Sequence, residues 1–242
     1  MDDEMAALRI AKKELRTTIR HRLSQLSTDS IAKQCPVATK NLISLPEYKL
    51  AKQVGIYLSM PQGELSTRDI VHDAFEQGKQ IFVPYIHKHE KRSVMDMVTL
   101  HSIEDYENLK PDAWGIPSIQ ADSVERRDRV LGSRLGNSEN ASEKNPNNER
   151  SNQSRTIGGE TLDLMVMPGV AFDESLGRLG HGKGFYDYFL ERYQHCKTST
   201  LPFLVGLSLD VQLLPRSQLV PTDPSDYKLN ALIMGDGTKV RR

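Results

Sequence analysis

The chain has 242 residues, which suffices for one substantial hydrophobic core, so we expect a single domain over residues 1–242. Lysine and arginine together number 32, as do aspartate and glutamate, so the net charge of zero argues against nucleic-acid partners and an acidic membrane surface. The two cysteines, Cys35 and Cys196, are far apart in sequence, which argues against a disulfide framework or a zinc site.

No apolar run approaches the roughly 20 residues that span a bilayer. The first five residues are acidic rather than arginine-rich or apolar, so they resemble neither a secretion signal nor an import signal. We therefore expect a cytoplasmic protein that is not bound to a membrane, with a monomer as the working expectation.

Two helices are predicted at the start of the chain. Leu8, Leu15 and Ile19 belong to an apolar stripe with helical spacing over residues 4–26. Residues 27–45 also have a helical pattern, but Pro36 would remove a hydrogen bond from the interior of a helix. The sequence leaves the continuity of the second helix open.

Apolar runs and a helical segment then alternate along the chain. QVGIYLS (53–59) and QIFVPYI (80–86) are typical of buried strands, and a helical pattern over 67–77 lies between them. Further strands are expected within LDLMVMPG (162–169), PFLVGLSL (202–209) and NALIMG (230–235). Because helices between apolar strands cover both faces of a sheet, this order predicts a doubly wound, mostly parallel α/β fold.

The stretch from Gly132 to Thr156 has almost no apolar residues. Such a composition cannot bury enough apolar surface to offset the entropy lost on ordering. We therefore expect a disordered insertion over residues 133–155 within the single domain.

A glycine-rich loop follows the strand predicted at 162–167. Gly177, Gly180, Gly182 and Gly184 lie within PGVAFDESLGRLGHGKGFYDYFLERY, just before a predicted helix. Glycines let consecutive backbone N–H groups approach an anion, and a helix N-terminus adds partial positive charge. Because Gly184 stands where a P-loop requires serine or threonine, this is a phosphate-binding loop of another kind, or simply a flexible turn.

The segments PGVAFD (168–173) and GRLGHGKGFYD (177–187) resemble the signature of the 5-formyltetrahydrofolate cyclo-ligase family, whose usual form is close to RLGxGxGYYD. Phe185 replaces the first tyrosine of that pattern, and His181 occupies a variable position. The resemblance extends over most of the chain outside residues 118–160. AKKELR (11–16), IYLSMPQGELST (56–67), MDMV (95–98), WGIP (114–117) and VPTDPSDYKLNALI (220–233) carry it further.

The resemblance implies three groups of site residues. The ATP-binding group would be Lys12, Lys13, Arg16, Arg178, Leu179, Gly180, His181, Gly182, Lys183, Gly184, Phe185 and Tyr186. The folate-binding group would be Leu58, Glu64, Trp114, His181, Gly182, Lys183, Gly184 and Phe185. Asp187 and Asp226 would bind Mg²⁺, and Arg178 and Lys183 would be catalytic. The family often has a second aspartate where this chain has Asn230, so any metal-binding role of Asn230 stays open.

The reaction that the resemblance implies is the conversion of 5-formyltetrahydrofolate to 5,10-methenyltetrahydrofolate with hydrolysis of ATP to ADP and phosphate. From the residues alone, each of these side chains also has a structural interpretation: a solvated basic helix face, a core leucine, an acid at a helix start. Two other functions therefore stay open at this point: a sugar-phosphate isomerase-like enzyme with the same glycine loop, and a non-catalytic nucleotide-binding protein.

Overall fold

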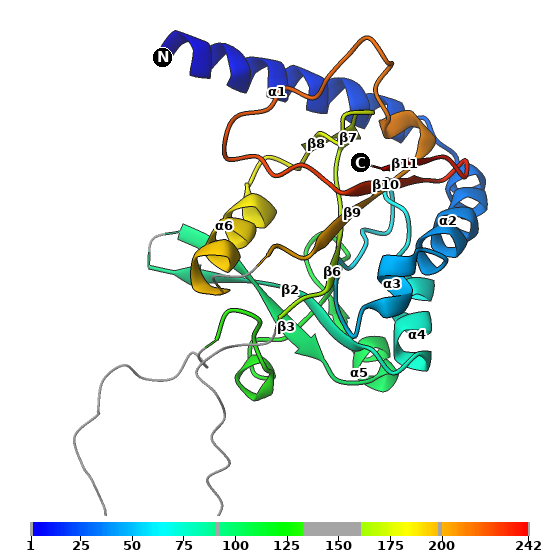
Figure 1. Ribbon diagram of the computed structural model, residues 1–242, viewed down its shortest axis with the longest axis vertical. Helices are drawn as coiled ribbons and strands as arrows, with labels where there is room; N and C mark the ends of the chain where they lie inside the picture. Colours follow the sequence, from blue (N-terminus) through cyan, green and yellow to red (C-terminus); the bar gives the residue numbers. More distant parts are fainter. Residues whose placement is uncertain (1, 91, 133–160, 198–199, 242) are drawn as a thin grey trace, which may run out of the picture.

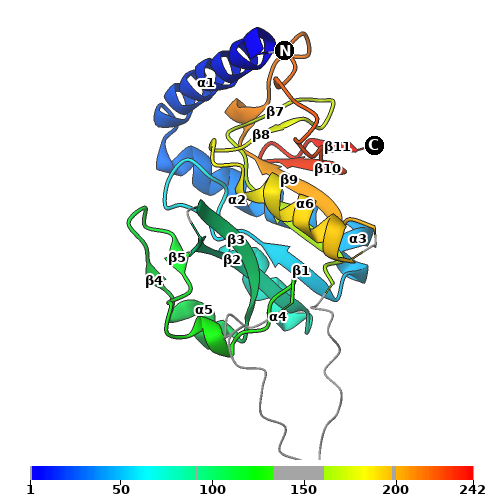
Figure 2. The same ribbon diagram turned by 90° about the vertical axis from the view of Figure 1, so that its left-hand side faces the viewer.

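The computed structural model describes residues 2–90, 92–132, 161–197 and 200–241, so the insertion expected at 133–155 lies outside the described residues. Its centre is a seven-stranded sheet with the order β11-β10-β9-β6-β1-β2-β3 (Figures 1 and 2). The strands are β1 (Gln53–Ile56), β2 (Gln80–His89), β3 (Arg92–Leu100), β6 (Leu164–Met167), β9 (Phe203–Ser208), β10 (Ala231–Met234) and β11 (Lys239–Arg241).

Six α-helices and two small hairpins complete the described chain. The helices are α1 (Asp2–Ser24), α2 (Thr28–Ile43), α3 (Pro46–Leu50), α4 (Arg68–Glu76), α5 (Ile103–Glu107) and α6 (Phe185–Lys197), with 3₁₀ turns at Val124–Arg126 and Asp210–Gln212. The hairpins pair β4 (Lys110–Pro111) with β5 (Pro117–Ser118), and β7 (Ala171–Phe172) with β8 (Arg178–Leu179). No helix among the described residues is long and apolar enough to cross a membrane.

The connections between strands confirm the doubly wound prediction. The five inner strands are parallel, and only the edge strands β3 and β11 run antiparallel to their neighbours. The chain steps from β1 through α4 to β2 in one direction, and from β6 through α6 to β9 in the other. Because β1 and β6 are neighbours, the winding reverses between them, and ligands of such folds bind beside the carboxyl ends of the strands at that point.

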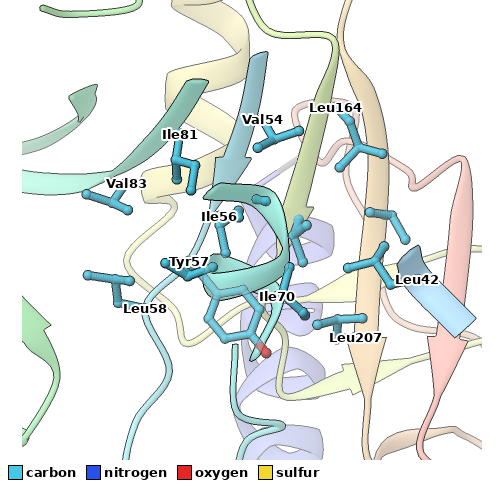
Figure 3. Close-up of a cluster of buried hydrophobic side chains, with 14 of the residues drawn as sticks. Leu42, Val54, Ile56, Tyr57, Leu58, Ile70, Ile81, Val83, Leu164 and Leu207 are labelled. Carbon is cyan, nitrogen blue, oxygen red and sulfur yellow. The ribbon is translucent and has the colours of Figure 1, made fainter. Parts of the chain in front are cut away.

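Helices cover both faces of the sheet, as the sequence predicts. On one face Leu42 of α2 and Ile70 of α4 pack against Val54, Ile56 and Ile81 of the central strands (Figure 3). On the other face the α6 residues Phe189, Leu190 and Tyr193 pack against Met165 of β6 and Met95 of β3. The β-strands are short apolar runs because both of their faces are buried.

The structure settles one point about α2 that the sequence leaves open, and it corrects the predicted length of β1. The helix α2 is continuous from Thr28 to Ile43 with Pro36 inside it. The strand predicted over 53–59 ends at Ile56, because the chain then leaves the sheet while Tyr57 and Leu58 stay buried in the core. The Tyr57 hydroxyl also donates to the Leu65 carbonyl at 2.9 Å. This hydrogen bond joins the two ends of the loop that follows β1.

Candidate functional site

The glycine loop is held between the β7–β8 hairpin and the start of α6. Asp173 shapes the hairpin turn, since its carboxylate accepts hydrogen bonds from the backbone N–H groups of Gly177 at 2.9 Å and Val220 at 2.7 Å. Gly182 and Gly184 have φ values of +103° and +65°, a region that other residues adopt only with strain. Glycine at these two positions lets the chain turn from β8 into α6.

Helix α1 lies across this loop and brings basic residues to it. Ile19 of α1 is fully buried against Ala171 and Leu179 of the hairpin, which fixes the helix in place. Arg16 then donates from Nε to the Gly180 carbonyl at 2.8 Å, and Arg20 donates to the His181 carbonyl at 3.3 Å. The basic face predicted near the start of the chain therefore lies on the glycine loop.

Lys12, one helical turn before Arg16, forms two ion pairs with the C-terminal part of the chain. Its Nζ lies 2.6 Å from Asp223 Oδ2 and 2.5 Å from Asp226 Oδ2. Burial acts to lower the pKa of Lys12, but the two carboxylates outweigh it and the pKa is raised. Hydrogen bonds from Lys12 and Ser225 lower the pKa of Asp223 to about 2. Lys12 and Asp223 are therefore both charged near neutral pH.

Arg178 and Asp187 form a second, bidentate ion pair across the loop. Arg178 Nη2 lies 2.9 and 2.8 Å from the two carboxylate oxygens of Asp187, and Arg178 Nη1 donates to the Pro168 carbonyl at 3.3 Å. The Tyr227 N–H also donates to Asp187, at 3.1 Å. Arg178 is only 5% exposed, and its Nε is buried without a hydrogen-bond partner among the described residues.

These groups surround one pocket of about 290 Å³, which we call the phosphate pocket. Its lining comes from α1, the glycine loop, the first turns of α6 and the 223–226 turn. The lining residues are Lys12, Arg16, Arg178, Leu179, Gly180, Gly182, Gly184, Asp187, Tyr188, Glu191, Asp223, Ser225 and Asp226. Nine of the residues that the family resemblance assigns to ATP or Mg²⁺ thus meet in one place: Lys12, Arg16, Arg178, Leu179, Gly180, Gly182, Gly184, Asp187 and Asp226.

Five residues assigned to ATP lie outside this lining. Lys13 and Lys183 are exposed, Phe185 and Tyr186 are partly buried at the start of α6, and His181 points towards Glu64. Conversely, Asp223, Ser225, Tyr188 and Glu191 line the pocket although the sequence analysis did not select them. Asp223 was recognisable as the start of an Asp-Pro-Ser turn before Asp226, but turn residues are usually structural.

The residues assigned to folate lie beside the carboxyl end of β1. Leu58 is in the hydrophobic core, and Glu64 is buried with its Oε1 3.8 Å from His181 Nε2. Trp114 is 71% exposed at the tip of the β4–β5 hairpin. That tip contacts the 60–64 loop, since a Cβ placed on Gly115 would lie 2.8 Å from Pro61 Cγ. Leu58, Glu64 and Trp114 thus belong to one side of the site, which we call the folate side.

The pKa values of the folate side differ from those of the phosphate pocket. Burial raises the pKa of Glu64 to about 7, although the Met60 N–H, 3.0 Å from Oε2, acts to lower it. Burial also lowers the pKa of His181, with smaller contributions from the positive charges of Arg20, Arg178 and Arg16. Glu64 can therefore change protonation state near neutral pH, whereas the neutral form of His181 is favoured.

The family resemblance assigns Asp187 and Asp226 to a metal ion, and both residues line the same pocket. Each is paired with a cation in this structure, and the described residues contain no cluster of three or more His, Cys, Asp or Glu suited to a metal ion. Two carboxylates beside a phosphate site still suit Mg²⁺, which usually takes one or two carboxylates plus phosphate and water oxygens. Asn230 does not line this pocket, and its Oδ1 accepts the Leu204 N–H at 2.7 Å.

Comparison with known proteins identifies the family of the chain. The model of the 5-formyltetrahydrofolate cyclo-ligase family matches residues 9–235. A probable 5-formyltetrahydrofolate cyclo-ligase of Schizosaccharomyces pombe is 34% identical over 93% of this chain and 95% of its own length. The 5-formyltetrahydrofolate cyclo-ligase of Mus musculus is 32% identical, with 96% and 98% covered.

A solved structure supports the same fold. The 5,10-methenyltetrahydrofolate synthetase of Aquifex aeolicus superposes with a TM-score of 0.61 at 23% identity, covering 95% of this chain and 92% of that one. With the family match spanning nearly all of the sequence, the chain belongs to the 5-formyltetrahydrofolate cyclo-ligase family of ligases.

Proposed function

We propose that this protein converts 5-formyltetrahydrofolate to 5,10-methenyltetrahydrofolate in a reaction that requires ATP and Mg²⁺ and releases ADP and phosphate. The observation that carries the proposal is the phosphate pocket, where Lys12, Arg16 and Arg178 converge on a glycine loop at the N-terminus of α6. Its position next to the folate side suits an enzyme that transfers a phosphoryl group from ATP to a bound folate.

In the proposed mechanism the formyl oxygen attacks the γ-phosphate of ATP and forms an imidate phosphate. The neighbouring arylamine nitrogen then attacks the formyl carbon, the ring closes and phosphate leaves. Phosphorylation turns a poor leaving group, the amide oxygen, into a good one. This chemistry depends on positioning and on charge stabilisation, which the loop N–H groups, Arg178 and Lys183 would supply without a covalent enzyme intermediate.

Asp187 and Asp226 would hold the Mg²⁺ that accompanies ATP, and that ion would neutralise part of the phosphate charge. Both carboxylates are engaged by Arg178 and Lys12 in the free protein. Phosphate oxygens would compete for these two cations and release the carboxylates. The ion pairs of the free site therefore keep four charged groups in place until the nucleotide arrives.

On the folate side, Leu58 and Phe185 would contact the pterin through apolar surface, and the exposed Trp114 would stack on an aromatic ring of the substrate. Glu64 lies deeper, beside His181 of the glycine loop. The glycine loop lies between the phosphate pocket and the folate side, so its residues can contact both substrates. These residues are His181, Gly182, Lys183 and Gly184.

The test is to incubate the purified protein with 5-formyltetrahydrofolate and Mg²⁺, with and without ATP, and to follow the absorbance of methenyl-folate. We expect an increase that depends on both ATP and Mg²⁺, with one ADP formed per methenyl-folate. A folded protein that gives no increase would contradict the proposal. ATP binding without folate turnover would instead support the non-catalytic alternative, and turnover of sugar phosphates without ATP the isomerase-like one.

We also propose a cytoplasmic location and a monomeric state. The two free cysteines, Cys35 and Cys196, suit a reducing compartment and support the first, although a relative from Arabidopsis thaliana is named as mitochondrial. Microscopy of a fluorescent fusion that keeps both ends of the chain tests the location, and light scattering tests the oligomeric state.

A further inference from the structure

Glu64 lies at the carboxyl end of β1, where the winding of the sheet reverses, and it is almost fully buried. Its side chain is 7% exposed, and its Oε2 accepts the Met60 N–H at 3.0 Å. Among the described residues, Oε1 accepts no hydrogen bond, and its partner at 3.8 Å is the imidazole Nε2 of His181. One oxygen of this buried carboxylate is therefore available to a substrate.

Among the described residues no permanent positive charge acts on the pKa of Glu64, which is set by burial and the Met60 N–H. Tyr57 already donates its hydroxyl to Leu65, and burial, followed by the charge of Glu64, raises the pKa of Tyr57 and of Tyr186 in α6. Cys35 of α2 faces Tyr57, and burial raises its pKa as well. All three groups are thus neutral near pH 7.

The cations nearby act on His181, and Arg178 also lies 5.7 Å from the centre of the Tyr186 ring. Arg16, Arg20 and Arg178 all act to lower the pKa of His181, which favours its neutral form. The His181 side chain is 40% exposed, whereas Glu64 is buried, so the imidazole lies between the carboxylate and solvent. A neutral imidazole in this place can accept a proton and pass it outward.

Ring closure in the proposed reaction has to dispose of one proton. The arylamine nitrogen carries a hydrogen when its electron pair forms the new bond to the formyl carbon. The proton must leave that nitrogen, and the electron pair of the C–O bond must leave with phosphate, before the conjugated methenyl product can form. A base beside the arylamine nitrogen would therefore accelerate this step but not the phosphoryl transfer before it.

We propose that Glu64 is this base: its Oε1 accepts the arylamine proton during ring closure, and His181 passes the proton to solvent. The inference rests on the proposed function. The gap of 3.8 Å between Glu64 and His181 has to shorten to hydrogen-bond length when the folate is bound, as catalytic hydrogen bonds commonly do. The Met60 N–H meanwhile keeps the carboxylate in place through its other oxygen.

The substitution Glu64→Gln separates the two steps, because glutamine has the same size and still accepts the Met60 N–H but cannot take a proton. ADP formation is measured by rapid quenching and methenyl-folate by absorbance, in the same reaction. We expect a burst of about one ADP per enzyme at the wild-type rate, followed by ring closure slowed by roughly 10²- to 10⁴-fold. The Michaelis constant for folate should change little.

The pH dependence gives a second readout. In the wild type, ring closure should become faster as pH rises through about 7, where Glu64 loses its proton, and in Glu64→Gln this rise should be absent. Glu174→Gln is the matched control, since Glu174 is 43% exposed and its ion-pair partner in the part of the chain that the structure describes is the exposed Arg216. This control should match the wild type in both steps.

Three outcomes would overturn the assignment: wild-type ring closure in Glu64→Gln, an equal loss of ADP and methenyl-folate with a raised Michaelis constant, or a wild-type rate of ring closure that does not depend on pH. If Glu64→Gln fails to fold, Glu64→Asp, which keeps a carboxylate, and the wild-type pH profile decide the question. If the wild type forms neither ADP nor methenyl-folate, the proposed function itself is wrong.

Discussion

Two kinds of carboxylate lie within the site. They differ in the groups that contact them: cations in the phosphate pocket, and neutral groups on the folate side. In the phosphate pocket Asp187, Asp223 and Asp226 each contact a cation at 2.9 Å or less. On the folate side Glu64 is buried, and its partners among the described residues are one backbone N–H and a more distant imidazole. A carboxylate that is already paired can hold cations, whereas one that is buried without a partner can exchange a proton.

The two sets also affect stability at opposite ends of the pH range. The lowered pKa of Asp223 means that its ion pair stabilises the fold above the pKa of the unfolded chain, an effect lost as pH falls through about 2. The raised pKa of Glu64 has the opposite effect, because the protonated side chain is the form that favours the folded state. Its contribution is complete below the ordinary value of 4.5 and is lost as pH rises through about 7.

The largest effect is expected when the charge balance of the phosphate pocket is broken by Arg178→Ala. This change removes the bidentate partner of Asp187 and a positive charge from the lining of the phosphate pocket. We expect turnover to fall by roughly 10³-fold, as for loss of a preorganised charged donor, and stability to fall by about 3 kcal/mol, because Asp187 is left unpaired. Steady-state kinetics and urea unfolding measure the two effects.

Arg216→Ala is the control for Arg178→Ala, because Arg216 is 89% exposed and pairs with Glu174 at the surface. Surface pairs contribute little, so neither turnover nor stability should change measurably. If Arg178→Ala retains wild-type turnover, Arg178 is a structural residue that only orients Asp187.

On the folate side the opposite result is expected for stability, since Glu64→Gln removes a costly buried charge. The pKa of Glu64 is raised from 4.5 to about 7, and each pH unit corresponds to 1.36 kcal/mol, so the gain at pH 9 relative to pH 4 is about 3 kcal/mol. Urea unfolding of wild type and variant at both pH values measures this difference. A gain that is equal at both pH values would show that Glu64 titrates normally.

Lys183 tests how far the phosphate pocket extends along the glycine loop. It is exposed and forms no ion pair with the described residues, so Lys183→Ala should leave stability unchanged. Turnover should fall by about 10²-fold if the side chain reaches the phosphates when ATP is bound. Unchanged turnover together with unchanged ATP affinity would reject its catalytic assignment.

The parts of this site that the sequence predicts are those carried by short segments. The apolar runs indicate the parallel strands, and the glycines before an amphipathic helix indicate the phosphate-binding loop. The sequence does not predict the pairs Lys12–Asp223 and Lys12–Asp226, which join residues more than 200 positions apart. Nor does it show that Arg178 and Asp187, assigned separately to ATP and Mg²⁺, hold each other in the free protein.

A smaller effect is expected when one carboxylate of the phosphate pocket loses its charge. Asp187→Asn and Asp226→Asn keep the size and much of the hydrogen bonding of each side chain but weaken a ligand for a hard cation. Each variant should fold normally and require on the order of tenfold more Mg²⁺ for half-maximal turnover. Magnesium titration of turnover measures this, and a variant with an unchanged titration excludes that residue as a ligand.

The smallest effect is expected from replacing residues 133–155 with a short Gly/Ser linker. This segment is polar and rich in asparagine, so it offers little apolar surface to either side of the site. The described chain on either side of it is already anchored, by the buried Val130 before it and Leu162 after it, both packed in the core beside α6.

The residues of the phosphate pocket and those of the folate side all come from outside that segment. Turnover, the Mg²⁺ requirement and the pH dependence of ring closure should therefore stay within about twofold of the wild type. The sharpest measurement is the pair of readouts that separates the two regions: the magnesium titration for the phosphate pocket and the pH profile for Glu64. A change in only one of them would show that the segment acts on that region, because loss of the fold would alter both.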